Sequence, residues 1–312
     1  MATATKPAQA REPLRSTLRA PVRVVGVACG MGAPDARCAQ GPAALRKHGL
    51  IARLRQAGVD AAWSATIAAP AKGDRVTIIS NVAEALASRT EELVARGRVP
   101  VVLGGDHSCA IGTWKGVARA LPQNTPGLVW IDAHMDAHTA ETTASGYIHG
   151  MPAACLLGDG DPRLTGIAGG IRLHPHRVCL VGVRSFETGE AALLRRLGVR
   201  VFFMHDVERR GLQDVMKEAV AIAGAGGSRY GISLDLDAVD PRDAPGVGSP
   251  VAGGIRGADL LHALARCGRG PALAGLEITE YNPERDRDGK TARLVTAAIQ
   301  ALLAPRALSV VS

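Results

Sequence analysis

The sequence predicts an α/β protein in which a parallel sheet is covered by helices. From Val22 onward, short runs rich in Val, Leu and Ile alternate with longer segments of helical period, and this alternation is typical of parallel sheets. With 312 residues, 46% of them hydrophobic, the chain can bury a sizeable core. No repeat and no long Pro/Ser linker divides it after residue 20, so we expect a single domain over residues 21–312.

Seven apolar runs rich in Val, Leu and Ile are predicted to be strands. In chain order they are Val22 to Val27, Pro100 to Leu103, Gly127 to Ile131, Arg177 to Val183, Val199 to Phe203, Tyr230 to Asp235 and Ala272 to Ile278.

The segments between these runs carry apolar residues at helical spacing. The predicted helices are Pro42 to Ala57, Asn81 to Arg96, Cys109 to Leu121, Gly189 to Leu197, Leu212 to Ala223, Gly257 to Arg266 and Thr291 to Leu303. Pro42 suits a first helical turn, where its missing N–H costs nothing. Asn81, with Glu84 three residues later, predicts a capped start, and Gly97 predicts the end of that helix.

Charge and composition disfavour a nucleic-acid binder. The formal net charge is +8, but four basic residues lie within the first twenty positions and the others are scattered. There are only three each of Trp, Tyr and Phe, too few for a basic groove interleaved with aromatic rings. Residues 1–20 are expected to form an unstructured tail.

The cysteines indicate a reducing compartment. None of the six lies in a Cys-x-x-Cys pair, and most sit in apolar runs such as 178–183, where a thiol behaves as a small hydrophobe. No run approaches the roughly 20 apolar residues of a membrane span, and the first residues lack the apolar core of a secretory signal. We therefore expect a cytoplasmic protein with no membrane attachment.

Three acidic and histidine-bearing segments each follow a predicted strand. They are Gly104-Gly105-Asp106-His107, Asp132-Ala133-His134-Met135-Asp136 and Asp235-Leu236-Asp237. Residues two apart on an extended segment point the same way, and functional groups of open α/β sheets gather beyond the carboxyl ends of the strands. Six candidate metal ligands result: His107, Asp132, His134, Asp136, Asp235 and Asp237.

Such a set of acids would repel one another without a cation. Oxygen and imidazole ligands suit Mn²⁺ and similar divalent ions, whereas a structural zinc site normally recruits cysteine. The ligands exceed the needs of one ion, which indicates two ions with shared carboxylates. Such a pair can hold a hydroxide as nucleophile at neutral pH, so hydrolysis is the expected reaction. Asp240, just beyond the last segment, is expected only to cap a turn.

Together these segments resemble the arginase or ureohydrolase family. The likeness covers nearly everything after residue 21 and includes Gly-Gly-Asp-His-Ser at 104–108, Asp-Ala-His-Met-Asp-Ala-His at 132–138 and Ser-Leu-Asp-Leu-Asp-Ala-Val-Asp-Pro at 233–241. It extends to Ser-Gly-Tyr-Ile-His-Gly at 145–150 and Gly-Leu-Glu-Ile-Thr-Glu-Tyr-Asn-Pro at 275–283. The resemblance, which is strongest to bacterial arginases, implies a three-layer α/β/α sandwich that holds two Mn²⁺ ions and releases urea from a guanidino compound.

The resemblance also implies a role for each ligand. One ion would be held by His107, Asp132, Asp136 and Asp235, and the other by Asp132, His134, Asp235 and Asp237. Asp132 and Asp235 would bridge the ions, a bridging hydroxide would attack the guanidinium carbon, and Asp136 would carry a proton to the departing amine.

Further residues match positions that handle protons and substrate in this family. His149 matches a proton-shuttling histidine. Glu280 matches the carboxylate that holds the guanidinium, for which a carboxylate is the geometric complement. Glu277 is expected to support this region indirectly, by hydrogen bonds to the residues that contact the metals or the substrate.

The implied substrate is L-arginine, because the segment 142–150 looks more like arginases than agmatinases. The positions expected at the substrate tail are Ser145, His138, Tyr147 and Glu187. His138 and Tyr147 stand where the family usually has Asn, and Glu187 where it usually has Asp. A protonated His138 would replace an amide, and Glu187 keeps the charge that meets an α-ammonium.

Several alternatives are also compatible with the sequence. Agmatine or guanidinobutyrate would use the same metals with a different tail pocket. A zinc deacetylase of related fold would need one ion and fewer acids. A non-catalytic, metal-dependent binding protein is the alternative of another class. Family members are commonly trimers or hexamers, so the resemblance implies a homo-oligomer with a small guanidino substrate.

Overall fold

The computed structural model describes residues 20–121, 123, 125–267 and 272–305. The tail predicted for residues 1–20 therefore lies, apart from residue 20, outside the described residues. One eight-stranded sheet organises the described part, with every strand pairing parallel to its neighbours in the order β2-β1-β3-β8-β7-β4-β5-β6. Its strands are β1 Val22–Ala28, β2 Ala61–Ala68, β3 Val99–Leu103, β4 Gly127–Ile131, β5 Val178–Val183, β6 Arg200–Phe203, β7 Tyr230–Asp235 and β8 Leu273–Thr279.

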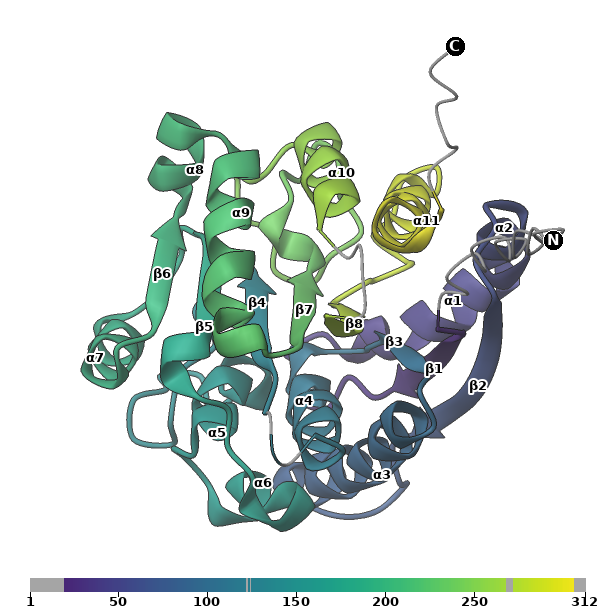
Figure 1. The fold of residues 1–312 in the computed structure, drawn as a ribbon. Coiled ribbons are helices and arrows are strands. Elements are labelled where there is room, and N and C mark those ends of the chain that lie inside the picture. Colours follow the sequence, from purple (N-terminus) through teal and green to yellow (C-terminus); the bar gives the residue numbers. More distant parts are fainter. Residues whose placement is uncertain (1–19, 122, 124, 268–271, 306–312) are drawn as a thin grey trace, which may run out of the picture.

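Helices cover both faces of this sheet, as Figure 1 shows, and give the predicted three-layer α/β/α sandwich. The α-helices are α1 Gly41–Lys47, α2 Leu50–Gln56, α3 Arg75–Ala95, α4 Ala110–Arg119, α5 Pro152–Leu157, α6 Pro162–Thr165, α7 Thr188–Leu197, α8 Met204–Arg210, α9 Leu212–Ala223, α10 Gly257–Arg266 and α11 Lys290–Leu303. Apolar side chains of α1, α2 and α8 to α11 pack on one face. Those of α3, α4, α5 and α7 pack on the other. Burial on both faces explains why the central strands are continuous apolar runs.

Seven strands appear where the sequence predicts them, and β2 was missed. Its sequence, AAWSATIA, is poor in Val and Leu, and most of its residues are only half-buried or exposed. β2 lies at one edge of the sheet, where one side of the strand is unpaired and a fully apolar run is not required.

The first two predicted helices differ from the observed ones. The segment 42–57 is broken into α1 and α2 at Gly49, whose φ of 76° belongs to the left-handed region. Pro42 does lie in the first turn of α1. The long helix α3 begins six residues before the prediction: Asp74, not Asn81, is its N-cap, and its side chain accepts the N–H of Thr77.

Three short helices, α5, α6 and α8, were also not predicted. Each has four to seven residues, too few for a periodic apolar pattern to be recognised.

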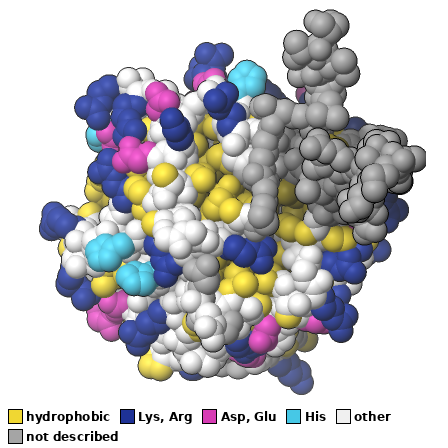
Figure 2. All heavy atoms as spheres, viewed as in Figure 1, with side chains coloured by type: hydrophobic (Ala, Val, Ile, Leu, Met, Phe, Trp, Pro, Cys, Tyr) yellow, Lys and Arg dark blue, Asp and Glu magenta, His cyan; other side chains and the backbone are white. Residues whose placement is uncertain are grey.

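The visible surface agrees with the prediction that basic residues are scattered and form no basic groove. On the face shown in Figure 2, Lys and Arg side chains are spread among acidic and uncharged ones. None of the described helices is both long enough and apolar enough to cross a bilayer.

Candidate metal centre

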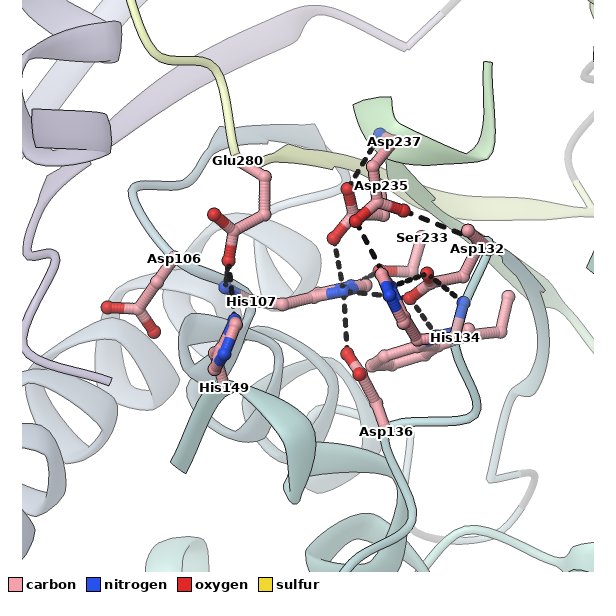
Figure 3. A network of polar contacts seen from close by, with 12 residues as sticks. Asp106, His107, Asp132, His134, Asp136, His149, Ser233, Asp235, Asp237 and Glu280 are labelled. Atoms are coloured by element: carbon pink, nitrogen blue, oxygen red, sulfur yellow. Dashed lines mark hydrogen bonds and ion pairs between the residues drawn. The ribbon is translucent and has the colours of Figure 1, made fainter. Parts of the chain in front are cut away.

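All the predicted metal ligands lie at the carboxyl ends of three central strands, and Glu280 lies at the end of a fourth. The strands β3, β8, β7 and β4 are consecutive in the sheet. His107 follows β3, Glu280 follows β8, and Asp235 ends β7. Asp132 directly follows β4 and begins the segment that also holds His134 and Asp136. Parallel strands thus bring together residues that are more than a hundred positions apart (Figure 3).

The imidazole of His107 stands at the centre of this group. Its Nδ1 lies 3.0 Å from an oxygen of Asp136, 3.0 Å from one of Asp235 and 3.2 Å from one of Asp132. Despite these three close carboxylates, the buried Nδ1 makes no hydrogen bond of proper geometry. Three oxygens and one nitrogen that converge without hydrogen bonds to one another are typical of ligands around a cation.

A second group shares one member with the first. His134 Nδ1 lies 3.1 Å from Asp237 Oδ2 and 3.5 Å from Asp132 Oδ1. The other oxygen of Asp132, Oδ2, is the one that faces His107. Asp132 therefore points one oxygen at each group, as a bridging carboxylate does.

Asp235 differs from Asp132 in this respect. It belongs with His107, Asp132 and Asp136, but not with the group of His134 and Asp237. Its Oδ2 faces His107, while its Oδ1 accepts the N–H of Asp237. A bridging role for Asp235 stays a prediction.

Without a cation, the charged form of three carboxylates in this cluster is disfavoured. Burial and the neighbouring Asp132 raise the pKa of Asp136 to about 6 and that of Asp235 to about 7. Burial and the two carboxylates Asp235 and Asp132 raise the pKa of Asp237 well above its usual range. Burial alone would lower the pKa of His134, but Asp237 and Asp132 raise it to about 12. Divalent cations would neutralise these carboxylates, so the residues present fit a metal centre.

Trp130 supports this centre, although nothing in the sequence pattern predicts that role. Its ring stacks on that of His107, with centroids 4.1 Å apart and planes 14° from parallel. Its Nε1–H donates to Asp132 Oδ2 at 2.9 Å. The indole thus fixes one ligand ring and one ligand oxygen together.

A buried hydrogen-bond chain fixes the orientation of His107. Ser233 Oγ donates to Glu277 Oε2 at 2.7 Å and lies 3.0 Å from His107 Nε2. Because its only hydrogen goes to Glu277, Ser233 must accept from His107, so Nε2 carries a proton and Nδ1 is the ring nitrogen that faces the carboxylates. The support expected from Glu277 is thus visible, and Ser233 transmits it.

Ser233→Ala is expected to weaken binding of Mn²⁺ about tenfold, since loss of a partner that orients a ligand histidine typically costs 10–100-fold in affinity. Calorimetric titration of the metal-free protein with Mn²⁺ measures this constant. The control is Ser80→Ala, which removes an exposed hydroxyl bonded only to a backbone carbonyl. Equal affinities for the two variants would contradict the assigned role of Ser233.

Glu280 and His149 lie directly beside the cluster. Glu280 Oε1 accepts the backbone N–H of His107 at 3.0 Å and lies 3.3 Å from His149 Nδ1. Burial lowers the pKa of His149, but the hydrogen bond to Glu280 outweighs this and raises it to about 9. Glu280 has a φ of 65° and Asp136 one of 50°, a left-handed conformation that costs such residues about 1–3 kcal/mol.

The residues expected at the substrate tail occupy the rim of the site. His138 Nε2 lies 2.9 Å from Glu187 Oε2, and its Nδ1 lies 3.1 Å from Thr142 Oγ1. Ser145 is exposed, and its Oγ accepts the N–H of Tyr147. Both ring nitrogens of His138 are thus engaged within the protein, which the sequence did not reveal.

Glu190 joins His138 and Glu187 at this rim and was not predicted. It is buried, its Oε1 accepts the N–H of Ala137 and its Oε2 that of Glu187. Glu187 and Glu190 form a capping box for α7, and their three-residue spacing was the signal that could have revealed Glu190. Asp240, as expected, caps a turn: its Oδ1 accepts the backbone N–H of Arg242.

Comparison with known proteins agrees with this geometry. The chain matches the Arginase family over residues 20–304. It is 40% identical to the arginase of Bacillus caldovelox over 90% of this chain and 97% of that one. The crystal structure of an arginase from Bacillus subtilis superimposes with a TM-score of 0.85 at 34% identity, covering 92% of this chain and all of that one. Proclavaminate amidino hydrolase from Streptomyces clavuligerus gives a TM-score of 0.69 at 25% identity, with 91% of each chain covered.

Proposed function

Because this chain belongs to the arginase family, we propose that it hydrolyses L-arginine to L-ornithine and urea and uses two Mn²⁺ ions. As a member of the family it is a hydrolase of the ureohydrolase type. The observation that carries the finer proposal is the pair of ligand groups joined by Asp132, with Glu280 and His149 at their side.

The proposed ligands divide between two ions. His107, Asp132, Asp136 and Asp235 would hold one, and Asp132, His134, Asp235 and Asp237 the other, with Asp132 and Asp235 shared. Carboxylate and imidazole ligands without cysteine favour Mn²⁺ over a structural zinc ion. When bound, such a pair lowers the pKa of a water molecule enough to supply a nucleophile at neutral pH.

Glu280 would bind the substrate guanidinium. Its Oε1 is fixed by the N–H of His107 and by His149, and among the described residues none donates a hydrogen bond to Oε2. A carboxylate held in this way offers Oε2 to a guanidinium N–H. The substrate carbon would thereby be oriented toward the ligand groups around His107.

His149 and Asp136 would move protons. A pKa of about 9 keeps His149 protonated at neutral pH, so its ring can hold a proton for exchange with solvent, to which it is partly exposed. Asp136 would pass a proton to the departing amine. His138, Ser145, Tyr147 and Glu187 would contact the substrate tail, with Glu187 facing the α-ammonium.

A urea-release assay tests this function. Purified protein loaded with Mn²⁺ is supplied in turn with L-arginine, agmatine and 4-guanidinobutyrate, and urea release from L-arginine is expected. Turnover of agmatine or guanidinobutyrate without L-arginine would identify the enzyme as another ureohydrolase. This second candidate is favoured by the mutual engagement of His138 and Glu187 at the rim. No turnover of any of them by metal-loaded protein would favour a non-catalytic binding protein.

Removal of metal is expected to lower the thermal stability of the protein. A ligand that binds only the folded state at a hundred times its Kd stabilises by about 2.7 kcal/mol, which corresponds to several degrees in the Tm of a chain this size. Differential scanning calorimetry after chelation, and again after Mn²⁺ is restored, measures the shift. A Tm that is identical in the two states would exclude a resident metal pair.

The proposal also covers the number of domains, the cellular location and the oligomeric state. We infer one catalytic domain over residues 21–312, acting in the cytoplasm as a homo-oligomer, a trimer or hexamer as in the family. Light scattering coupled to size-exclusion chromatography measures the oligomeric state.

A further inference from the structure

Arg75 is a positive charge at the rim of the site that no carboxylate neutralises. It is exposed and is the first residue of α3, which follows β2. Within the described part of the chain, no Asp or Glu forms an ion pair with it. The neighbouring Asp74 is engaged elsewhere, because it caps α3 through Thr77 and lies 3.4 Å from Arg163.

The side chain of Arg75 is held in place by Tyr147. Its guanidinium carbon lies 4.7 Å from the centre of the Tyr147 ring, a distance typical of a cation–π contact. A guanidinium on an aromatic ring keeps its N–H groups available at its periphery. Arg75 is therefore oriented and still able to form a bidentate pair with a carboxylate.

Tyr147 links Arg75 to the proposed catalytic groups. The rings of Tyr147 and His149 meet edge to face, with centroids 6.2 Å apart, and His149 contacts Glu280. The two distances together place the Arg75 guanidinium within about 11 Å of the His149 ring. Along this series Glu280 is buried, His149 and Tyr147 are half-buried and Arg75 is exposed, so the series runs outward, as a substrate tail must.

His138, which also lies at the rim, is not free to bind a substrate carboxylate. His138 uses one ring nitrogen for Glu187 and the other for Thr142, and the Glu187 carboxylate beside it repels another anion. A substrate carboxylate therefore meets a free cation at Arg75, whereas both ring nitrogens of His138 are already engaged.

We propose that Arg75, held over Tyr147, binds the carboxylate of guanidino-acid substrates and makes the enzyme prefer them to guanidino amines that lack a carboxylate. This inference rests on the proposed hydrolysis of a guanidino group and adds the chemical class of the substrate tail.

The experiment compares kcat/KM for L-arginine, 4-guanidinobutyrate and agmatine in the Mn²⁺-loaded enzyme. In Arg75→Gln, the preference for each acid over agmatine is expected to fall about tenfold, mainly through a higher KM for the acids. Arg96→Gln is the matched control: it removes the same charge from the other end of α3, where Arg96 is highly exposed, and should keep the wild-type preference.

A second pair of variants tests the role of the ring. Tyr147→Phe keeps the aromatic face and should retain the preference, whereas Tyr147→Leu should lower it several-fold. Each variant is judged by its ratio of kcat/KM for an acid to kcat/KM for agmatine. A general loss of activity caused by a change next to His149 therefore cancels.

Two outcomes are decisive and distinct. If the wild-type enzyme releases urea but Arg75→Gln leaves the ratios of acids to agmatine unchanged, this inference is overturned and the proposed function stands. If the wild-type enzyme releases urea from none of the three compounds, the proposed function is overturned, and the inference with it.

Discussion

Asp235→Asn is expected to lower kcat/KM for the preferred guanidino substrate on the order of a thousandfold, because it removes one negative charge from the carboxylates that face His107. The fold should survive. Asp235 is an N-cap whose Oδ1 accepts the N–H of Asp237, and asparagine caps as well as aspartate does. The measurement is urea release together with bound Mn²⁺ per chain, determined by atomic spectroscopy.

Asp240→Asn is the matched control for this variant. Asp240 lies five residues further along the same acidic segment, but it belongs to neither ligand group. It also caps a turn through its Oδ1, which accepts the N–H of Arg242. Its substitution should leave the metal content at the wild-type value and change urea release less than twofold. Full activity and full metal content in Asp235→Asn would refute the two-ion centre.

The second large effect is expected on stability. Glu277 is completely buried between α4 and β7 and accepts four donors. Thr113 and Cys109 donate to Oε1, and Trp114 and Ser233 donate to Oε2. Glu277→Gln replaces one acceptor by an NH₂ group that meets two donors. The expected loss is about 3 kcal/mol in the free energy of unfolding, or roughly 6–12 °C in Tm.

Calorimetry of the metal-free protein measures this loss without a contribution from bound ions. The control is Glu91→Gln, which removes a partly exposed ion pair with Arg119 and should change the free energy of unfolding by less than about 1 kcal/mol. If both variants melt at the same temperature, the buried hydrogen bonds of Glu277 contribute no more than a surface pair.

The central strands were predictable because burial on both faces of the sheet makes each of them a continuous apolar run, and the helices between them carry apolar residues at helical spacing. β4 and β7 have the predicted bounds, and α9 and α10 do as well. The start of α3 was not predictable from propensity, because Val76, Thr77, Ile78 and Ile79 form a β-branched run. Packing of Ile78 and Ile79 in the core fixes this run as helix.

The proposed ligands were predictable for a similar reason. Their type and their spacing along short segments indicate a metal, and the parallel sheet brings the segments to one edge. Arg75 lies 72 positions before Tyr147 and outside any motif. Trp130 and Ser233 each lie within a buried strand, between two apolar neighbours. Their contacts depend on strand order and side-chain packing, which no local pattern contains.

Because Trp130 stacks on His107, its intrinsic fluorescence can serve as a probe of metal binding. Of its three tryptophans, only Trp130 contacts proposed ligands, through its ring on His107 and its N–H on Asp132. Trp63 lies in the edge strand β2 beneath Arg46, and Trp114 bonds to Glu277. Entry of a divalent ion changes the charge beside the indole of Trp130, so its emission should report occupancy in real time, without a label and without turnover.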